Sequence, residues 1–266
     1  MKSFRRKTLA EMVRFKGLGL HSGEPVTVVV RPGEDGISFN GVEAVPENIT
    51  DTERCTRLGT ISTVEHLMSA FAGVGVTDAE VVVRGQELPA MDGASLAYTE
   101  GILSAGLSEL GTCSIERFDA PVFHSEGGAR VTVEKGRGVW RYEFECGDRW
   151  PWSQHFRLEL NPESYCREVA PARTFVFEDE LEAVRAAGLG QGLNERTAFV
   201  IGTSTYLNAP KFKDEPARHK MLDLIGDLYL SGVPIGLLNV VATRSGHTAN
   251  VALADKLRRA VTLERS

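Results

Sequence analysis

Apolar and polar positions follow two different periods along this chain, and the period separates predicted strands from predicted helices. Segment 23–32, GEPVTVVVRP, is rich in β-branched residues and predicts a strand, and DAEVVVRG at 78–85 predicts a buried one. The stretch between Pro32 and about residue 60 is rich in Gly, Pro, Asp and Asn, which predicts short strands and turns. Segments 62–73 and 95–106 predict helices, each followed or ended by glycine. Ser62 and Glu65 have the spacing of a capping box for the first of them.

The second half of the chain repeats this alternation. Segment 121–144 predicts two strands around a Lys-Gly-Arg-Gly turn, and strands at 172–177 and 197–202 flank a helix at 178–187 and a glycine loop at 188–194. The clearest helix is 215–231, with Pro216 in its first turn and Gly232 at its end. A strand at 235–241, a turn at 245–247 and a final helix complete the pattern. The core face of helix 215–231 carries Met221, Leu222, Ile225, Leu228 and Tyr229.

The two halves resemble each other weakly. Each has strands, then a helix with a histidine in its first turns, then a Gly-Val pair (75–76 and 232–233) and a β-rich run. This repetition predicts an α+β fold made of two similar layered domains, each a sheet with helices, packed face to face. We place the domains at 1–114 and 115–266. Their helices would meet at the interface, which is a common location for an active site.

Composition and charge limit the classes of function. The chain has 266 residues, of which 42% are hydrophobic and 25% charged, as in ordinary globular proteins. Its net charge of −6 argues against general nucleic-acid binding, although a local basic pocket for one anion remains compatible. No apolar run has the length of a membrane span, and the basic N-terminal segment lacks the features of a secretory signal. The four cysteines form no Cys-x-x-Cys pair, which is typical of reduced thiols in the cytoplasm.

Helix-compatible segments contain a candidate metal site. His219 and Asp223 are four residues apart in RHKMLDLIGDL, so a helix presents both side chains on one face. Two ligands on one helix and a histidine from elsewhere, such as His66, would build a catalytic zinc site with one open position. The alternative for His219 and Asp223 is an ordinary surface pair. His66 could equally be a core histidine whose polar atoms are satisfied.

Other residues could carry proton transfer. Glu65, adjacent to His66, points about 100° away from it on a helix and could act as a general base, or it could cap the helix. His247 could be a general acid or stabilise an oxyanion while Asp227 keeps it protonated, or the two could be a turn histidine and a solvated charge. Lys220 could bind an anion or be an exposed lysine.

Two strand residues and two glycine-rich segments complete the candidates. Thr174 could polarise a carbonyl group and Phe175 could line an apolar slot, or both could be ordinary strand residues. The segments GLGLHSG and GLGQGLN match neither the Walker pattern nor the dinucleotide fingerprint, so we interpret them as turns.

Several segments resemble a known family. The motifs ISTVEHLMSAFAGVGV, ELPAMDGAS, ARTFVF, DEPARHKMLDLIGDL and SGH, with the N-terminal RKTLAEMVRFKGLGLHSGEPVTVVVRP, are similar to those of UDP-3-O-acyl-N-acetylglucosamine deacetylases, the LpxC family. The similarity runs in order over nearly the whole chain. It implies a cytoplasmic zinc enzyme that removes acetate from the 2-amino group of a UDP-linked, 3-O-acylated glucosamine early in lipid A synthesis.

The resemblance also implies roles for individual residues. His66, His219 and Asp223 would be the metal ligands, with zinc or Fe²⁺ as the ion. Glu65 would be the general base, and His247 the general acid, oriented by Asp227. Lys220 and Thr174 would assist substrate and oxyanion binding, and Phe175 would lie near the sugar or nucleotide. A β-α-β insert at about 171–201 would form a tunnel for the acyl chain.

The chain also departs from the family pattern. The region between Pro32 and Ile61 is short, and CGDRWPWSQHF, with Trp150 and Trp152, occupies a place where nucleotide contacts are expected. These departures leave two alternatives open: a zinc amidase acting on another acetylated sugar nucleotide, and a non-catalytic ligand-binding protein on the same fold. The expected partner is a small-molecule UDP-sugar, without nucleic acid, and we expect a monomer.

Overall fold

The structure is a computed structural model that describes residues 2–119 and 121–265. Its first half forms a five-stranded sheet in the order β2-β3-β8-β4-β5. All neighbouring strands are antiparallel except β4 and β8, which are parallel. The bounds are β2 Val13–Leu18, β3 Pro25–Pro32, β4 Ile37–Phe39, β5 Val42–Glu43 and β8 Ala79–Arg84, with helices α1 Glu65–Val74 and α2 Leu96–Ser104. The 3-10 helix η1 (Pro46–Asn48) and the short strands β6 (Ile49–Asp51) and β7 (Arg57–Leu58) lie between β5 and α1.

The second half repeats this topology. Its sheet has the order β10-β11-β16-β12-β13, and again one pair, β12 and β16, is parallel. The bounds are β10 Val122–Glu126, β11 Ala129–Lys135, β12 Val139–Glu145, β13 Ser153–Glu159 and β16 Leu238–Thr243, with α3 Pro162–Glu168, α5 Glu215–Tyr229 and α6 His247–Ala260. Each strand of one sheet therefore has a counterpart in the other, and α1 and α2 correspond to α5 and α6.

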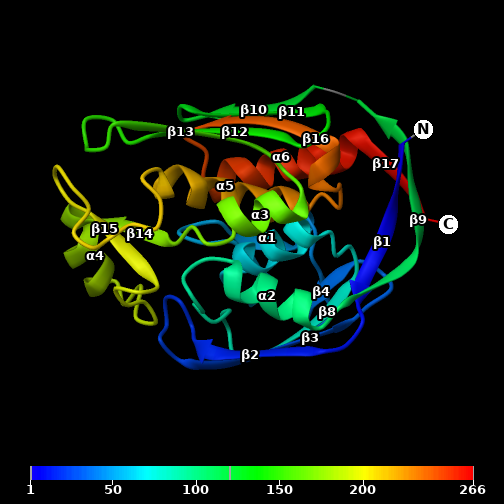
Figure 1. The fold of residues 1–266 in the computed structure, drawn as a ribbon, viewed down its shortest axis with the longest axis horizontal. Coiled ribbons are helices and arrows are strands. Elements are labelled where there is room, and N and C mark those ends of the chain that lie inside the picture. The colour runs from blue at the N-terminus through cyan, green and yellow to red at the C-terminus, as the bar shows by residue number, and fades with distance from the viewer. Residues whose placement is uncertain (1, 120, 266) are drawn as a thin grey trace.

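The two sheets lie on the outside, and the helices are packed between them as two inner layers (Figure 1). Strands in both sheets alternate buried and exposed residues, because one face of each sheet packs on helices. Helices α1 and α5 are buried along their length, and their apolar residues form one continuous core with those of the strands. The expected α+β fold of two similar layers packed face to face is confirmed.

A third sheet joins the ends of the chain. β1 (Lys2–Leu9) and β17 (Val261–Arg265) both pair with β9 (Leu107–Phe118), so the sequence termini lie together at one side of the molecule (Figure 1). The proposed division between residues 114 and 115 falls inside β9, and it stays a prediction. Of the helices within the described ranges, none combines the length and apolar character that crossing a membrane requires.

A β-α-β unit projects from the second half, at the end of the molecule opposite the termini (Figure 1). Its strands β14 (Thr174–Phe177) and β15 (Ala198–Ile201) are parallel, and the 3-10 helix η2 (Glu178–Glu180) and the helix α4 (Leu181–Ala186) connect them. Gly188 and Gly190 have φ near +68° and +69° in the connection after α4, where glycine avoids a Cβ clash. We call residues 174–201 the insert.

Several local predictions were wrong. Segment 121–144 contains three strands, because Gly127 and Gly128 form an additional turn. Residues 235–237 form a 3-10 helix, η3 (Ile235–Leu237), before β16, and helix α3 was not predicted. Residues 245–247 are no isolated turn, because Gly246 is the N-cap of α6 and His247 its first residue.

The predicted capping box on the first helix is also absent. Val64 is the N-cap of α1, and the Ser62 hydroxyl instead accepts a hydrogen bond from Arg57 at 2.9 Å. The Glu65 carboxylate accepts a hydrogen bond from the backbone N–H of Thr56 at 3.0 Å. Glu65 is therefore directed away from its own helix end, toward the interior of the molecule.

Candidate metal centre

Three candidate ligands converge between helices α1 and α5. His66 is in the first turn of α1, and His219 and Asp223 lie one turn apart on α5. The Nε2 atoms of His66 and His219 are 3.6 Å and 3.5 Å from the same carboxylate oxygen, Oδ1 of Asp223. One ligand atom from each of the three residues lies within 4.8 Å of the others, and all three side chains are buried.

The chemistry of these donor atoms fits a cation. The Ala172 carbonyl can only accept a hydrogen bond, so Nδ1 of His219, 3.0 Å away, must donate the proton. Burial lowers the pKa of His219 to about 3, so its ring is neutral and Nε2 presents a lone pair. That lone pair faces Oδ1 of Asp223, which is buried and has no hydrogen-bond partner among the described residues. Two facing electron-pair donors require a positive charge between them, which a divalent metal ion would supply.

The charges around the site also favour a cation between the candidate ligands. Burial alone would raise the pKa of Asp223, but the cationic Lys220 and the protonated His247 hold that pKa well below its usual range. Burial opposes protonation of His66, yet the nearby Asp223 and Glu65 raise its pKa. The carboxylates thus attract a positive charge to this point, whether it is a proton on His66 or a metal ion.

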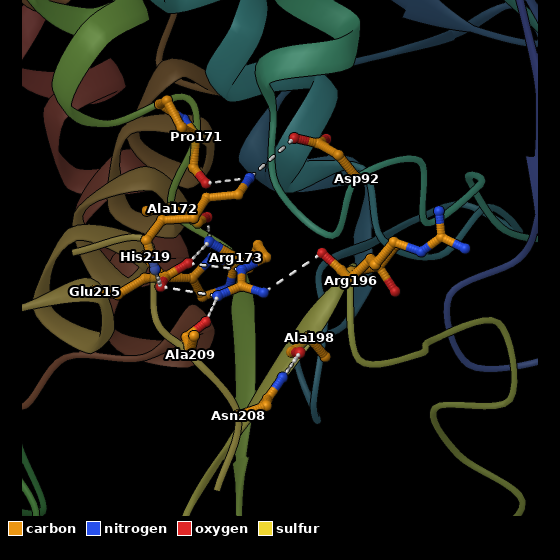
Figure 2. A network of polar contacts seen from close by, with 12 residues as sticks. Asp92, Pro171, Ala172, Arg173, Arg196, Ala198, Asn208, Ala209, Glu215 and His219 are labelled. Carbon is orange, nitrogen blue, oxygen red and sulfur yellow. Dashed lines mark hydrogen bonds and ion pairs between the residues drawn. The ribbon is translucent and has the colours of Figure 1, made fainter. Parts of the chain in front are cut away.

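Polar contacts behind the ligands fix α5 against the start of β14 (Figure 2). Arg173 and Glu215 form a buried ion pair at 2.9 Å, and Arg173 also donates to the Ala209 carbonyl. Glu215 accepts a further hydrogen bond from the backbone N–H of Arg173. This pair holds the strand beside Ala172 in place, and Ala172 orients the His219 ring.

A carboxylate and an imidazole lie close to the three ligands. Burial raises the pKa of Glu65 to about 7. Nδ1 of His247 is 3.0 Å from Asp227, and its Nε2 atom is 4.0 Å from Asp223. Burial alone would lower the pKa of His247, but the charge and hydrogen bond of Asp227 raise it to about 9. Near neutral pH, Glu65 can therefore accept a proton and His247 can donate one.

Sequence reasoning missed Thr56 and Asn250, which support these two residues. The Thr56 hydroxyl donates to Oδ1 of Asp227 at 2.6 Å, while its backbone N–H donates to Glu65. Asn250 donates to the other oxygen of Asp227 at 2.9 Å. Asp227 is fully buried, so these contacts compensate its desolvation. Thr56 lies in a loop without periodic pattern, and no sequence signal identified it.

The remaining candidates surround a cavity beside the ligands. Thr174 and Phe175 line it at the start of the insert, and Lys220 lines it from α5, with its ammonium group 2.8 Å from Asp223. Glu65, His66, His219, Asp223 and His247 also border this cavity, so the structure brings nearly all predicted site residues together. Asp227 lies behind His247 and orients it rather than lining the cavity.

The two glycine-rich segments meet at this cavity. Gln191 and Gly192 of the insert donate backbone hydrogen bonds to the carbonyls of His21 and Leu20. The interpretation of both segments as turns is compatible with this contact, but it missed His21, which lines the cavity. The neighbouring Gly19–Gly23 turn is held by Glu87, whose carboxylate accepts from the backbone N–H groups of His21 and Ser22.

The tryptophan-containing turn lies against the insert. Arg149 stacks on the Phe177 ring at 3.6 Å and forms an ion pair with Glu180 at 2.7 Å. The Trp150 ring packs on Tyr206 at 4.7 Å. Within the described residues, neither Trp150 nor Trp152 lines the cavity that contains the candidate ligands. The segment that departs from the family pattern therefore contacts the insert rather than the cavity.

Comparison with protein families gives a match over almost the entire chain. The family model described as UDP-3-O-acyl N-acetylglycosamine deacetylase, LpxC, matches residues 6–259. The chain belongs to the LpxC family.

Relatives that carry the family's name are similar to this chain over most of its length. A UDP-3-O-acyl-N-acetylglucosamine deacetylase of Anaeromyxobacter dehalogenans is 37% identical, over 97% of this chain and 88% of the relative. The proteins of the same name from Geotalea uraniireducens and Acidithiobacillus ferrooxidans are each 36% identical, over 92% and 97% of this chain and 85% and 90% of their own lengths. The LpxC family assignment therefore covers both halves of the fold and the cavity between them.

Proposed function

We propose that this protein hydrolyses the N-acetyl group of UDP-3-O-acyl-N-acetylglucosamine and releases acetate, a step of lipid A biosynthesis. The observation that carries the proposal is the buried group of His66, His219 and Asp223, with Glu65 and His247 beside it around one cavity. A ligand-binding protein would need neither a carboxylate with a pKa near 7 nor a histidine with a pKa near 9 next to a cation site.

His66, His219 and Asp223 would hold the metal ion, which we propose to be Zn²⁺, with Fe²⁺ as the alternative. Two imidazoles and one carboxylate are a common ligand set for catalytic zinc. The ion would supply an acidified water and polarisation of the acetyl carbonyl. Asp223 contributes its charge to this position and is itself held by the Lys220 ammonium group at 2.8 Å.

Glu65 acts as the general base in this proposal. Its raised pKa makes it a stronger proton acceptor than an exposed carboxylate, and the Thr56 N–H fixes its orientation. His247, protonated and held by Asp227, stabilises the developing oxyanion and returns a proton to the leaving amine. Thr174 donates a hydrogen bond to the carbonyl oxygen, and Lys220 contributes to binding of the anionic substrate.

The insert provides a place for the acyl chain. The cavity at the ligands and a second, more apolar cavity beneath the insert share lining residues from β14, α4 and the glycine loop: Phe175, Val176, Val184, Leu189 and Leu193. Phe175 also packs edge-on against the His219 ring, with centroids 6.1 Å apart. Two adjoining cavities, one at the metal ligands and a more apolar one beside it, suit a substrate with both an acetylated amine and a hydrocarbon chain.

The direct test combines acetate release with metal content. Purified protein is assayed with UDP-3-O-acyl-N-acetylglucosamine, and its metal content is compared with that of His219→Ala. We expect acetate release by the wild type, and loss of both the metal and the activity in the variant. His155→Ala is the control, because His155 is an exposed histidine on β13 and is not among the residues that line the cavity. Equal turnover of an acetylated sugar nucleotide without the acyl chain would instead favour an amidase of different specificity.

The UDP-linked substrate places the proposed reaction in the cytoplasm. We also propose that the protein acts as a monomer, because the candidate site is built from both halves of a single chain. Size measurement in solution tests this second point.

A further inference from the structure

The outer face of the first sheet is strongly basic, although the chain has a net charge of −6. β2, β3 and β8 direct alternate residues away from the helices, and a shallow groove crosses this outward side. Four basic residues line the groove: Arg14, Lys16, Arg31 and Arg84. Among the outward-facing described residues of these three strands, Glu80 is the one acid, and it lies opposite Arg31. We call this surface the basic face.

No ion pair within the described residues neutralises the four cations. Within residues 2–119 and 121–265, none of their side chains forms an ion pair or a hydrogen bond. The register spreads them over the sheet, with Lys16 and Arg84 on either side of Thr27 and Arg14 next to Val29. Four unpaired cations on one side of the sheet create a positive potential that attracts an anionic surface.

Apolar side chains are exposed between and beside these cations. Met12 is 63% exposed and Leu18 is 48% exposed at the two ends of β2, and Val29 and Val82 line the middle of the groove. Figure 1 shows helices on the inner side of this sheet and no element covering its outer side. Basic and apolar side chains together are typical of surfaces that bind the headgroup region of a bilayer.

We propose that the basic face docks this protein on an anionic phospholipid surface. A second copy of the chain, packed symmetrically, would bring the same four cations together and repel. Single-stranded nucleic acid needs aromatic side chains for stacking, and the described residues of the basic face include none. An anionic bilayer satisfies both the cations and the exposed Met12 and Leu18.

Docking through the basic face would also determine where the insert lies. Leu18 ends β2 directly before the turn at residues 19–23, whose Leu20 and His21 carbonyls bind the insert. A docked sheet would therefore hold the insert near the membrane. The benefit of holding the insert near the membrane rests on the proposed function, in which the insert receives a lipid chain. Docking on the membrane does not depend on that function.

Vesicle flotation tests the proposal without any activity measurement. The full chain is mixed with phosphatidylcholine vesicles that contain or lack phosphatidylglycerol. We expect binding to the anionic vesicles alone, weakened by salt. Arg14→Glu combined with Lys16→Glu should lower partitioning at least about 25-fold, because each basic residue near an anionic surface contributes roughly fivefold.

The matched control reverses two charges on the outer face of the second sheet. Arg130→Glu combined with Arg141→Glu changes the net charge equally, and both arginines are exposed. This control should keep wild-type binding, and both double variants should keep the wild-type melting temperature. Absence of wild-type binding to anionic vesicles at low salt would overturn the proposal, as would equal losses in the two double variants.

Discussion

At the scale of single residues, the proposed reaction depends on two side chains with displaced pKa values. Glu65 is buried, which raises its pKa to about 7, and Asp227 raises the pKa of His247 to about 9 despite burial. Glu65, the proposed base, is unprotonated above the first value, and His247, the proposed acid, is protonated below the second. Both are in their working states between these values, as acid–base catalysis requires.

A bell-shaped pH dependence of kcat/KM follows from these values. The rate should rise as Glu65 loses its proton near pH 7 and fall as His247 loses its proton near pH 9. Asp227→Asn removes the charge that raises the His247 pKa, so the basic limb should move to lower pH. Steady-state assays across this range measure both limbs. An unchanged basic limb in Asp227→Asn would show that His247 is not the group observed.

Glu65→Gln tests the base directly. The amide oxygen of glutamine can still accept the hydrogen bond from the Thr56 N–H, but the side chain cannot accept a proton. We expect kcat to fall by about 10²- to 10⁴-fold. Metal content should stay at the wild-type level, and thermal stability should not fall, because an unfavourably buried charge is removed. A variant with nearly the wild-type rate would exclude Glu65 as the base.

The close approach of α1 and α5 is the decisive feature at the scale of elements. Gly226 faces the first turn of α1, where a Cβ atom would collide with the carbonyl oxygen of Glu65. The helices can therefore pack closely enough for His66 on α1 to approach the carboxylate of Asp223 on α5. Gly73 permits a similar approach by the Tyr165 ring of α3.

Gly226→Ala should force these helices apart. We expect the free energy of unfolding to fall by about 1–3 kcal/mol, which is typical of overpacking against an unyielding neighbour. Metal affinity should also fall, since His66 moves relative to Asp223. Urea denaturation and metal titration measure the two effects. Gly236→Ala is the control, because no described atom lies within 4 Å of its would-be Cβ; similar losses in both variants would contradict the proposed role of this crossing.

The whole molecule is two copies of one sheet-and-helix arrangement whose helices face each other. The candidate metal site takes one ligand from α1 and two from α5, so a bound ion links the halves. Because the unfolded chain has no preformed site, metal binding should add to the stability of the packed halves.

Metal removal should therefore destabilise the whole fold. At a free zinc concentration a thousand times Kd, the folded state gains about 4 kcal/mol over the chelated protein. Calorimetry with zinc and with a chelator measures the shift in Tm. His66→Ala and His219→Ala remove ligands from opposite halves, and each should abolish the shift. A full zinc-dependent shift in either variant would place the ion elsewhere.

Periodicity along the chain was enough to predict most of the helices and strands and the ligand pair on α5. The pairing of His219 with Asp223 was predictable because residues four apart on a helix share one face. Gly75 is the C-cap of α1, as predicted, whereas α5 ends at Tyr229, before Gly232. The repeated order of strands and helices also predicted two similar α+β layers. These features depend on neighbours within a few residues, which periodicity records.

Which distant residues meet depends on how the helices and loops pack in three dimensions. Thr56 contacts both Glu65 and Asp227, and the tryptophan-containing turn contacts the insert instead of the cavity. His66 reaches Asp223 because Gly226 lets two helices from different halves pack closely. The contacts of Thr56 with Asp227 and of His66 with Asp223 join residues more than a hundred positions apart in the sequence. No local pattern of hydrophobic and polar positions encodes them.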